Sequence, residues 1–409
     1  MNYRLIVVIF SLFYSLIYAF PTKKGTTLGL HVSGNKLLDG EGKEFIFRGV
    51  NIPHNWFHDK TEFSLKEIAA LGANSARIVL GNGSKFSKNS VEDVEQVIEW
   101  CENLNLVCVF EIHDFTGSDD PTNITMDAIE YWKDFKDLFN THKDYIILNI
   151  ANEWMAANNQ SDLWAETYIS AIKSLRKIGF EGAIMVDTSG YGQEAASLIS
   201  HAPKIVKADP TGNVIFDCHV YAALGKDDAT IINNFNVIKS NGICFIVGEF
   251  GWWHYGNNVA FQTLLKYSAE NNIGWISWSW AGNSGIDNIL DLTSPKTFAK
   301  EDLTDWGKFV FYSQYGIQNT SKLAYGKVNK VIYNTNPSDA TVIPIKQSDE
   351  STSTSTTNLN TNPNNNNTIL NNNENNSSSG GQHLIKEMTM STKIFFFIIV
   401  GFLTIINLL

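Results

Sequence analysis

The feature that most constrains the fold is a series of eight short apolar runs separated by longer amphipathic segments. The runs are continuously apolar and rich in β-branched residues, which is typical of parallel strands covered on both faces. They span residues 45–50, 76–80, 106–112, 145–150, 183–186, 214–219, 244–247 and 274–278.

Helix-like segments lie between these runs, at residues 64–71, 91–105, 128–140, 163–178 and 260–272. Two of the helix starts, at Ser64 and at Ser90, carry capping boxes, in which a hydroxyl and an acidic side chain bond the first backbone N–H groups. Strands that alternate with helices in this way predict an α/β fold, namely a single (β/α)8 TIM barrel over residues 26–333. A doubly wound open sheet is the alternative.

The first residues predict a secretory signal peptide over 1–19. Arg4 precedes the apolar run Leu5–Phe10, and the small residue Ala19 ends the segment. We exclude this segment from the fold, and an N-terminal membrane anchor is the alternative reading. Within residues 26–333, four acceptor triplets for N-glycans are consistent with export, at Asn82, Asn123, Asn159 and Asn319.

The last residues predict attachment to the outer cell surface. Residues 340–381 are rich in Ser, Thr and Asn, and a segment with so few apolar residues is expected to be a disordered stalk. Residues 382–409 follow small residues and end in an apolar stretch from Ile394, as in a glycosylphosphatidylinositol (GPI) anchor signal. An ordinary transmembrane helix is the alternative. We expect a secreted monomer that meets the membrane only through a lipid.

The four cysteines fit an oxidising compartment but are too few for a disulfide scaffold. Pairing Cys101 with Cys108 and Cys218 with Cys244 is the simplest arrangement. Free buried thiols are an equally good interpretation, because cysteine is among the residues most often buried.

Two glutamates, Glu153 and Glu249, stand at the ends of the fourth and seventh runs. A buried carboxylate without a partner is costly, so this position favours a site where charge is used. In a barrel both would lie at the C-terminal face, and a separation of about 5 to 5.5 Å would let one act as nucleophile and the other as acid and base. Structural, salt-bridged glutamates are the alternative.

Other side chains would converge on the same face: Arg77, His113, Asn152, His219, Tyr221, Trp278 and Trp280. An arginine beside a carboxylate lowers the pKa of that carboxyl group and keeps a nucleophile ionised. Indole rings can stack on the faces of sugar rings, and the candidates are Trp56, Trp154, Trp252, Trp253, Trp278 and Trp280.

Other function classes lack their signatures. The net charge of −11 leaves no basic stripe for nucleic acid. The G-x-G-x-x-A match at Gly190–Ala195 lies in the fifth unit and is interpreted as a turn. The sequence has no metalloprotease helix, no zinc-spaced cysteines and no serine hydrolase elbow, and His113 with Asp114 is too sparse for a metal, so no metal or organic cofactor is expected.

Seven motifs together resemble those of glycoside hydrolase family 5: Phe47–Asn51, Ala76–Leu80, Glu111–Asp114, Asn149–Trp154, His219–Tyr221, Gly248–Gly251 and Trp275–Asn283. Each occurs once and in order, and the resemblance covers about residues 28–322. Their order and spacing are similar to the branch that contains secreted bacterial endo-β-1,4-mannanases. The loop residues Trp252–Trp253 and Ala222–Ala223 depart from the pattern.

The resemblance implies a retaining hydrolase of mannan or glucomannan, with Glu153 as acid and base and Glu249 as nucleophile. It also implies that Arg77 and Tyr221 support the nucleophile and that His219 tunes the acid and base. Asn152 would hold the 2-hydroxyl of the substrate, and His113 and Trp278 would contact the sugar. A β-1,4-glucanase is the alternative within the class, and a non-catalytic polysaccharide-binding module is the alternative outside it.

Overall fold

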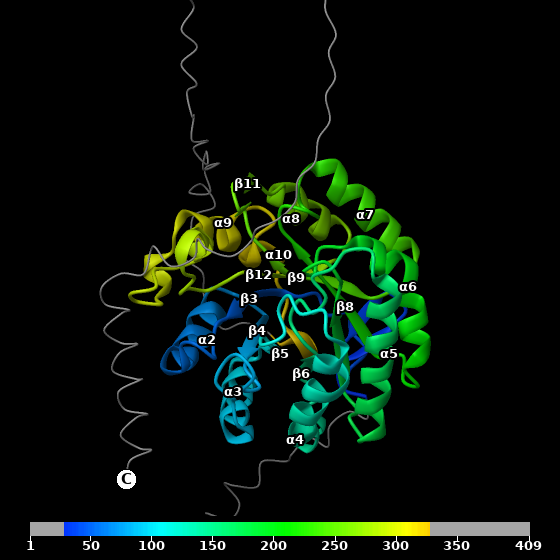
Figure 1. The fold of residues 1–409 in the computed structure, drawn as a ribbon. Helices are drawn as coiled ribbons and strands as arrows, with labels where there is room; N and C mark the ends of the chain where they lie inside the picture. Colours follow the sequence, from blue (N-terminus) through cyan, green and yellow to red (C-terminus); the bar gives the residue numbers. More distant parts are fainter. Residues whose placement is uncertain (1–27, 328–409) are drawn as a thin grey trace, which may run out of the picture. The chain divides into compact units, whose positions relative to one another are not determined.

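The computed structural model describes residues 28–327, and these residues form a closed barrel of parallel strands. Figure 1 shows the strands at the centre, surrounded by helices. In order around the barrel, the strands are β3 Arg48–Ile52, β4 Ser75–Leu80, β5 Val107–Ile112, β6 Ile146–Asn149, β7 Ala183–Asp187, β8 Val214–Val220, β9 Phe245–Phe250 and β12 Gly274–Ser277. The predicted TIM barrel is confirmed.

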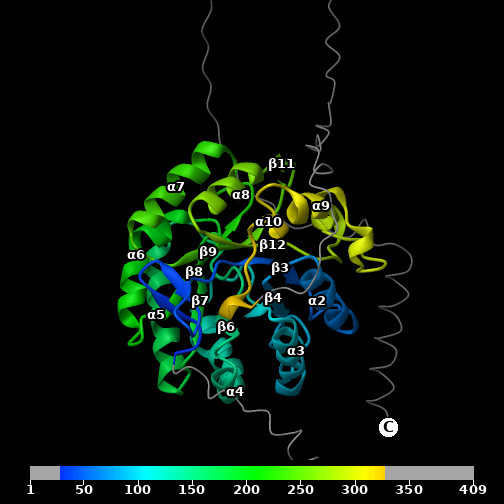
Figure 2. The same ribbon diagram turned by 180° about the vertical axis from the view of Figure 1, so that it is seen from behind.

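Helices follow the barrel strands along the chain and cover the outside of the barrel, as the two opposite views in Figures 1 and 2 show. They are α2 Thr61–Ala70, α3 Val91–Leu104, α4 Ala128–Thr141, α5 Ser161–Lys177, α6 Ala195–Ala208, α7 Asp228–Ser240, α8 Phe261–Glu270, α9 Asp305–Tyr312 and α10 Ile317–Thr320. A π-helical turn, Asn123–Asp127, leads into α4, and short 3-10 helices occupy His58–Lys60, Gly285–Leu290, Lys300–Asp302 and Ala324–Gly326.

Two small hairpins complete the described chain. The strands β1 (His31–Ser33) and β2 (Lys36–Leu38) precede the barrel, and β10 (Trp253–His254) and β11 (Asn257–Asn258) follow β9. Leu37 of β2 packs with residues near the N-terminal ends of the barrel strands, including Val107 and Ile147. The first hairpin therefore contributes to the core inside the barrel.

The barrel strands are buried along their whole length, which explains why their sequences are continuously apolar. One hydrophobic cluster lies between the strands and the helices, and a second fills the barrel interior. Because apolar residues fill the N-terminal half of the interior, polar side chains are concentrated toward the C-terminal ends of the strands.

Some local predictions differ from the structure. The first barrel strand starts at Arg48 rather than Phe45. At Ser90 the hydroxyl half of the capping box is confirmed by a hydrogen bond from the backbone N–H of Asp93 to the Ser90 hydroxyl, whereas the Asp93 carboxylate bonds Asn89 and His54. The box at Ser64 is wrong, because α2 already begins at Thr61. The sequence pattern did not single out α6, which contains Pro203, or the asparagine-rich α7.

The cysteine predictions are half right. A disulfide joins Cys101 and Cys108 and links the last turn of α3 to β5. Cys218 and Cys244 are free and buried, so their predicted pairing is wrong. Cys218 packs in the outer cluster and Cys244 in the inner one, so their side chains lie on opposite faces of the barrel wall.

The predicted signal peptide (1–19), stalk (340–381) and anchor signal (382–409) lie outside the described residues. Between residues 28 and 327, none of the helices has the length and apolar character needed to cross a bilayer.

Candidate active site

The two glutamates selected from the sequence face each other at the C-terminal end of the barrel. Glu249 lies in β9, and Glu153 lies in the turn after β6. One carboxylate oxygen of each and one nitrogen of His219 all lie within 4.8 Å of one another. This proximity matches two carboxylates that act on one bond by retention.

Glu249 is held by two hydrogen-bond donors at the bottom of the site. Arg77 Nη1 donates to Oε1 at 2.9 Å, and the Tyr221 hydroxyl donates to Oε2 at 3.0 Å. Both donors are buried, so the carboxylate has a fixed orientation. Burial raises the pKa of Glu249, although His219 and Arg77 oppose the shift. Arg77 lowers the pKa of Glu249, as the sequence predicts, but desolvation outweighs this effect and the pKa is raised overall.

Glu153 has different surroundings and is slightly more exposed, at 14% of its side chain against 5% for Glu249. Its Oε1 lies 2.7 Å from Nδ1 of His219. Its backbone N–H donates to Oδ2 of Asp187 at 2.8 Å, and its φ angle of 46° lies in the left-handed region that side chains rarely adopt. The backbone is thus tied down where the chain leaves β6, and it places the carboxylate opposite Glu249.

Arg77 is the central cation of the site and is fully buried in β4. Besides Glu249, its guanidinium donates to the side-chain oxygens of Asn51, Asn149 and Asn152 at 2.7 to 3.3 Å. Burial alone would lower the pKa of Arg77, but the surrounding carboxylates, Glu111 and Glu249 foremost, outweigh it and raise the pKa. The side chain therefore stays charged and orients several neighbours at once.

A second pair of carboxylates, which the sequence analysis missed, lies on the other side of the His219 ring. Nε2 of His219 is 3.6 Å from Asp187 and 3.7 Å from Asp217. Burial, and then repulsion from Asp217, raise the pKa of Asp187 to about 7. Burial opposes protonation of His219, but Glu249, Asp217 and Glu153 raise its pKa well above the ordinary value. Asp217 was detectable, because it interrupts an otherwise apolar run.

An aromatic group stands beside the carboxylates. His113 and Trp278 stack with ring centroids 5.7 Å apart, and Trp56 meets the edge of His113 at 5.2 Å. Nδ1 of His113 bonds Glu111 at 3.0 Å, and this neighbour raises the pKa of His113 despite burial. Trp56 is 39% exposed and Trp278 half-buried, so both can contact a ligand.

Trp280 and Trp154 do not belong to this group, so the prediction of a sugar-stacking role for them is wrong. Both are fully buried, and their indole N–H groups donate to the backbone carbonyls of Phe298 and Asp120. Trp280 was expected to share the side of Trp278, but β12 ends at Ser277 and strand alternation no longer applies beyond it. Trp252 and Trp253 are half-buried.

Asn152 is buried and bonds both Arg77 and Thr116. Its Oδ1 accepts from Arg77 at 2.7 Å, and its Nδ2 donates to the Thr116 hydroxyl at 2.9 Å. An amide nitrogen carries two hydrogens, so one N–H remains for a ligand.

The family model described as "Cellulase (glycosyl hydrolase family 5)" matches residues 38–284. The chain belongs to glycosyl hydrolase family 5. This family cleaves glycosidic bonds with retention, and the spacing and opposed orientation of Glu153 and Glu249 agree with that chemistry.

Relatives within family 5 give finer detail. The chain is 37% identical to a mannan endo-1,4-beta-mannosidase of Salipaludibacillus agaradhaerens, over 72% of this chain and 94% of the relative. It is 36% identical to one from Cellvibrio japonicus, over 72% and 69%. The catalytic domain of a Streptomyces sp. SirexAA-E mannanase superimposes with a TM-score of 0.69 at 35% identity, covering 75% of this chain and 96% of that domain.

Proposed function

We propose that the chain is an endo-acting β-1,4-mannanase that cleaves mannan or glucomannan by double displacement. The observation that carries the proposal is the pair of facing carboxylates, Glu153 and Glu249, within 4.8 Å of each other. The proposed substrate, mannan or glucomannan, follows from the mannosidase relatives, which match most of the barrel at up to 37% identity.

In the first step, a carboxylate oxygen of Glu249 attacks the anomeric carbon of the sugar. The glycosidic bond breaks, and Glu153 gives its proton to the departing oxygen. In the second step, Glu153 removes a proton from water, which attacks the same carbon and releases Glu249. Arg77 and Tyr221 suit the role of supporting the nucleophile, because each donates to one oxygen of Glu249. Each Glu249 oxygen then keeps a lone pair free for attack.

His219 contacts the catalytic groups from the side. It bonds Glu153 at 2.7 Å and lies 3.6 Å from Glu249, so a protonated ring stabilises both carboxylates. The remaining N–H of Asn152 suits the 2-hydroxyl of the bound sugar. The rings of His113, Trp278 and Trp56 suit the apolar faces of pyranose units.

A β-1,4-glucanase is the second candidate. Mannan and glucan differ only at the 2-hydroxyl, so one catalytic centre can act on both. A relative from Caldicellulosiruptor saccharolyticus that is 32% identical carries the name "Beta-mannanase/endoglucanase A". The chain covers 20% of that relative, which supports a shared catalytic domain only.

We further propose that the enzyme is a secreted, N-glycosylated monomer held outside the cell by a lipid anchor. The support lies in the sequence patterns of residues 1–19 and 382–409. Treating intact cells with a phosphatidylinositol-specific phospholipase should release the protein, whereas retention would favour a spanning helix.

Digestion of galactomannan, glucomannan and carboxymethylcellulose tests the activity. We expect new reducing ends from both mannans, and loss of most turnover in Glu153→Gln and in Glu249→Gln. Cleavage of cellulose alone would reject the mannanase. Binding without cleavage of any polymer would reject the enzyme and favour a binding module.

A further inference from the structure

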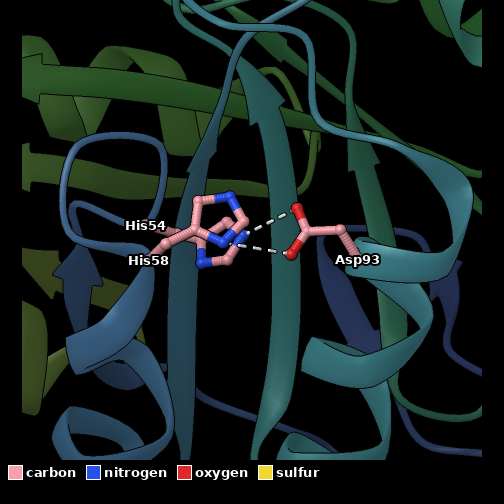
Figure 3. Close-up of side chains that lie close together, drawn as sticks. All are labelled: His54, His58 and Asp93. Atoms are coloured by element: carbon pink, nitrogen blue, oxygen red, sulfur yellow. Dashed lines mark hydrogen bonds and ion pairs between the residues drawn. The ribbon is translucent and has the colours of Figure 1, made fainter.

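Three groups of possible metal ligands occur among residues 28–327, and one of them lies outside the proposed active site. The other two share His219 and consist of groups already engaged in the catalytic centre. The separate group contains His54, His58 and Asp93, and we call it the His-His-Asp cluster. Figure 3 shows both imidazole rings directed at the carboxylate of Asp93.

The cluster connects two elements that are distant in the sequence. His54 and His58 belong to the segment that leads from β3 into α2, and Asp93 lies in the first turn of α3. Nε2 of His54 lies 3.1 Å from Oδ2 of Asp93, and Nδ1 of His58 lies 3.3 Å from Oδ1. The two ring centroids are 4.2 Å apart.

These separations suit a small metal ion. Zinc binds imidazole nitrogen and carboxylate oxygen at about 2.0 to 2.2 Å, and ligands at tetrahedral corners then lie about 3.3 Å apart. One donor atom from each of the three residues falls within 4.8 Å of the others, so modest rotation of the carboxylate and the His58 ring completes the site. Two imidazoles with one carboxylate favour a first-row transition metal over calcium or magnesium.

The surroundings orient the ligands as the outer shell of a metal site does. Nδ1 of His54 lies 2.7 Å from the Thr61 hydroxyl, which can accept its proton while Nε2 faces Asp93. Asn89 donates to Oδ2 of Asp93 at 2.8 Å, and its own oxygen is fixed by the backbone N–H of Gly81 at 2.9 Å. Two of the three ligands are therefore oriented in advance.

Access differs between the two histidines. His54 is buried, with 1% of its side chain exposed, whereas His58 is 54% exposed and borders solvent. An ion can thus enter from the side of His58, and water can supply the fourth ligand. Coordination through Nδ1 places the His58 ring proton on Nε2, so the 3.1 Å contact of Nε2 with the Asn89 amide is given up in the bound state.

We propose that His54, His58 and Asp93 form a site for one zinc ion or a chemically similar divalent transition metal. The bound ion joins the segment after β3 to α3. Trp56 lies between the two histidines in the sequence and contacts His113, so the ion braces one wall of the proposed substrate site. The proposal concerns binding and stands independently of the mannanase activity.

Calorimetric titration of the metal-free full chain with zinc chloride tests the site, and the visible absorption of bound Co²⁺ reports its geometry. We expect one equivalent bound, a tetrahedral cobalt spectrum, and at least a tenfold loss of affinity in His58→Ala and in Asp93→Asn. His58 is half-exposed, so His58→Ala should stay folded, which circular dichroism verifies.

His142→Ala is the matched control. His142 also bonds a carboxylate, Glu102 at 2.8 Å, but it belongs to none of the three ligand groups. This variant should bind zinc as the unchanged chain does. Absence of binding to the unchanged chain would overturn the proposal, and so would equal affinity in folded His58→Ala.

Discussion

Replacing Tyr221 with Phe removes one hydroxyl and tests how the proposed nucleophile is held. The hydroxyl is buried and donates to Glu249 Oε2 at 3.0 Å, and the Tyr221 ring stacks on His254 with centroids 4.9 Å apart. Phe keeps the ring, so the change is confined to one hydrogen bond. A hydrogen bond to a charged group contributes about 1.5 to 3 kcal/mol.

That loss acts on the ionised form of Glu249, whose pKa burial already raises. Removing a donor to the carboxylate raises this pKa further, by about one unit for each 1.36 kcal/mol. The nucleophile must be ionised, so the acid limb of kcat/KM against pH should move to higher pH by about 1 to 2 units. On the acid side of the profile, kcat/KM should fall by about tenfold or more.

The assay is hydrolysis of soluble galactomannan over a range of pH. Tyr325→Phe is the control, because it also removes one tyrosine hydroxyl, which donates to the Asp144 carbonyl. Tyr325 packs against the cluster at the N-terminal ends of the barrel strands, whereas Glu249 lies at the C-terminal end. This control variant should leave the pH profile in place. If Tyr221→Phe stays within about twofold of the unchanged chain at every pH, this account of how the nucleophile is held is refuted.

Three further predictions follow from the same contacts. Asp187 has its pKa raised to about 7 by burial and by Asp217, so the folded state retains a proton that the unfolded state loses, and stability falls as pH rises from about 4 to 7. In urea denaturation, the free energy of unfolding of Asp187→Asn relative to that of the unchanged chain should therefore be more favourable at about pH 8 than at about pH 5. An equal difference between the two proteins at both pH values would contradict this. Reducing the Cys101–Cys108 disulfide should lower the free energy of unfolding by about 2 kcal/mol, because the bond closes a short loop, whereas an unchanged urea midpoint would contradict it. Trp278→Ala should raise KM for mannan oligosaccharides about tenfold or more with the fold intact, because it removes a stacking surface beside His113; an unchanged KM would exclude Trp278 from the binding surface.

The sequence predicts the barrel and its two glutamates well, for a physical reason. Continuously apolar strands report burial on both faces, and parallel strands deliver the residues at their C-terminal ends to one place. Glu153 and Glu249 end two such runs, so their meeting follows from topology alone. The register of individual side chains was not needed for this prediction.

The parts that failed depend on that register. Trp278 and Trp280 lie two positions apart, but the strand ends at Ser277, and Trp280 turns into the core. Cys218 and Cys244 lie in or beside neighbouring strands but pack on opposite faces of the wall. Local spacing cannot report which face a side chain takes once the chain leaves a regular strand.

Residues that act through distant partners were also missed. Asp187 ends β7, whereas its partners Asp217 and His219 lie in β8, so the three side chains meet only through the pairing of the two strands. His54 and His58 stand four residues apart, but their third partner, Asp93, belongs to another helix. Such groups become visible only when the tertiary structure brings the elements together.

The measurement that tests the central claim most directly is the anomeric configuration of the first product released from a mannan oligosaccharide, followed by proton NMR before the anomers equilibrate. Glu153 and Glu249 are close enough for a covalent sugar intermediate, so the account predicts that the β-configuration of the cleaved bond appears first. Initial appearance of the α-anomer would mean that water attacks directly, and it would contradict the double displacement.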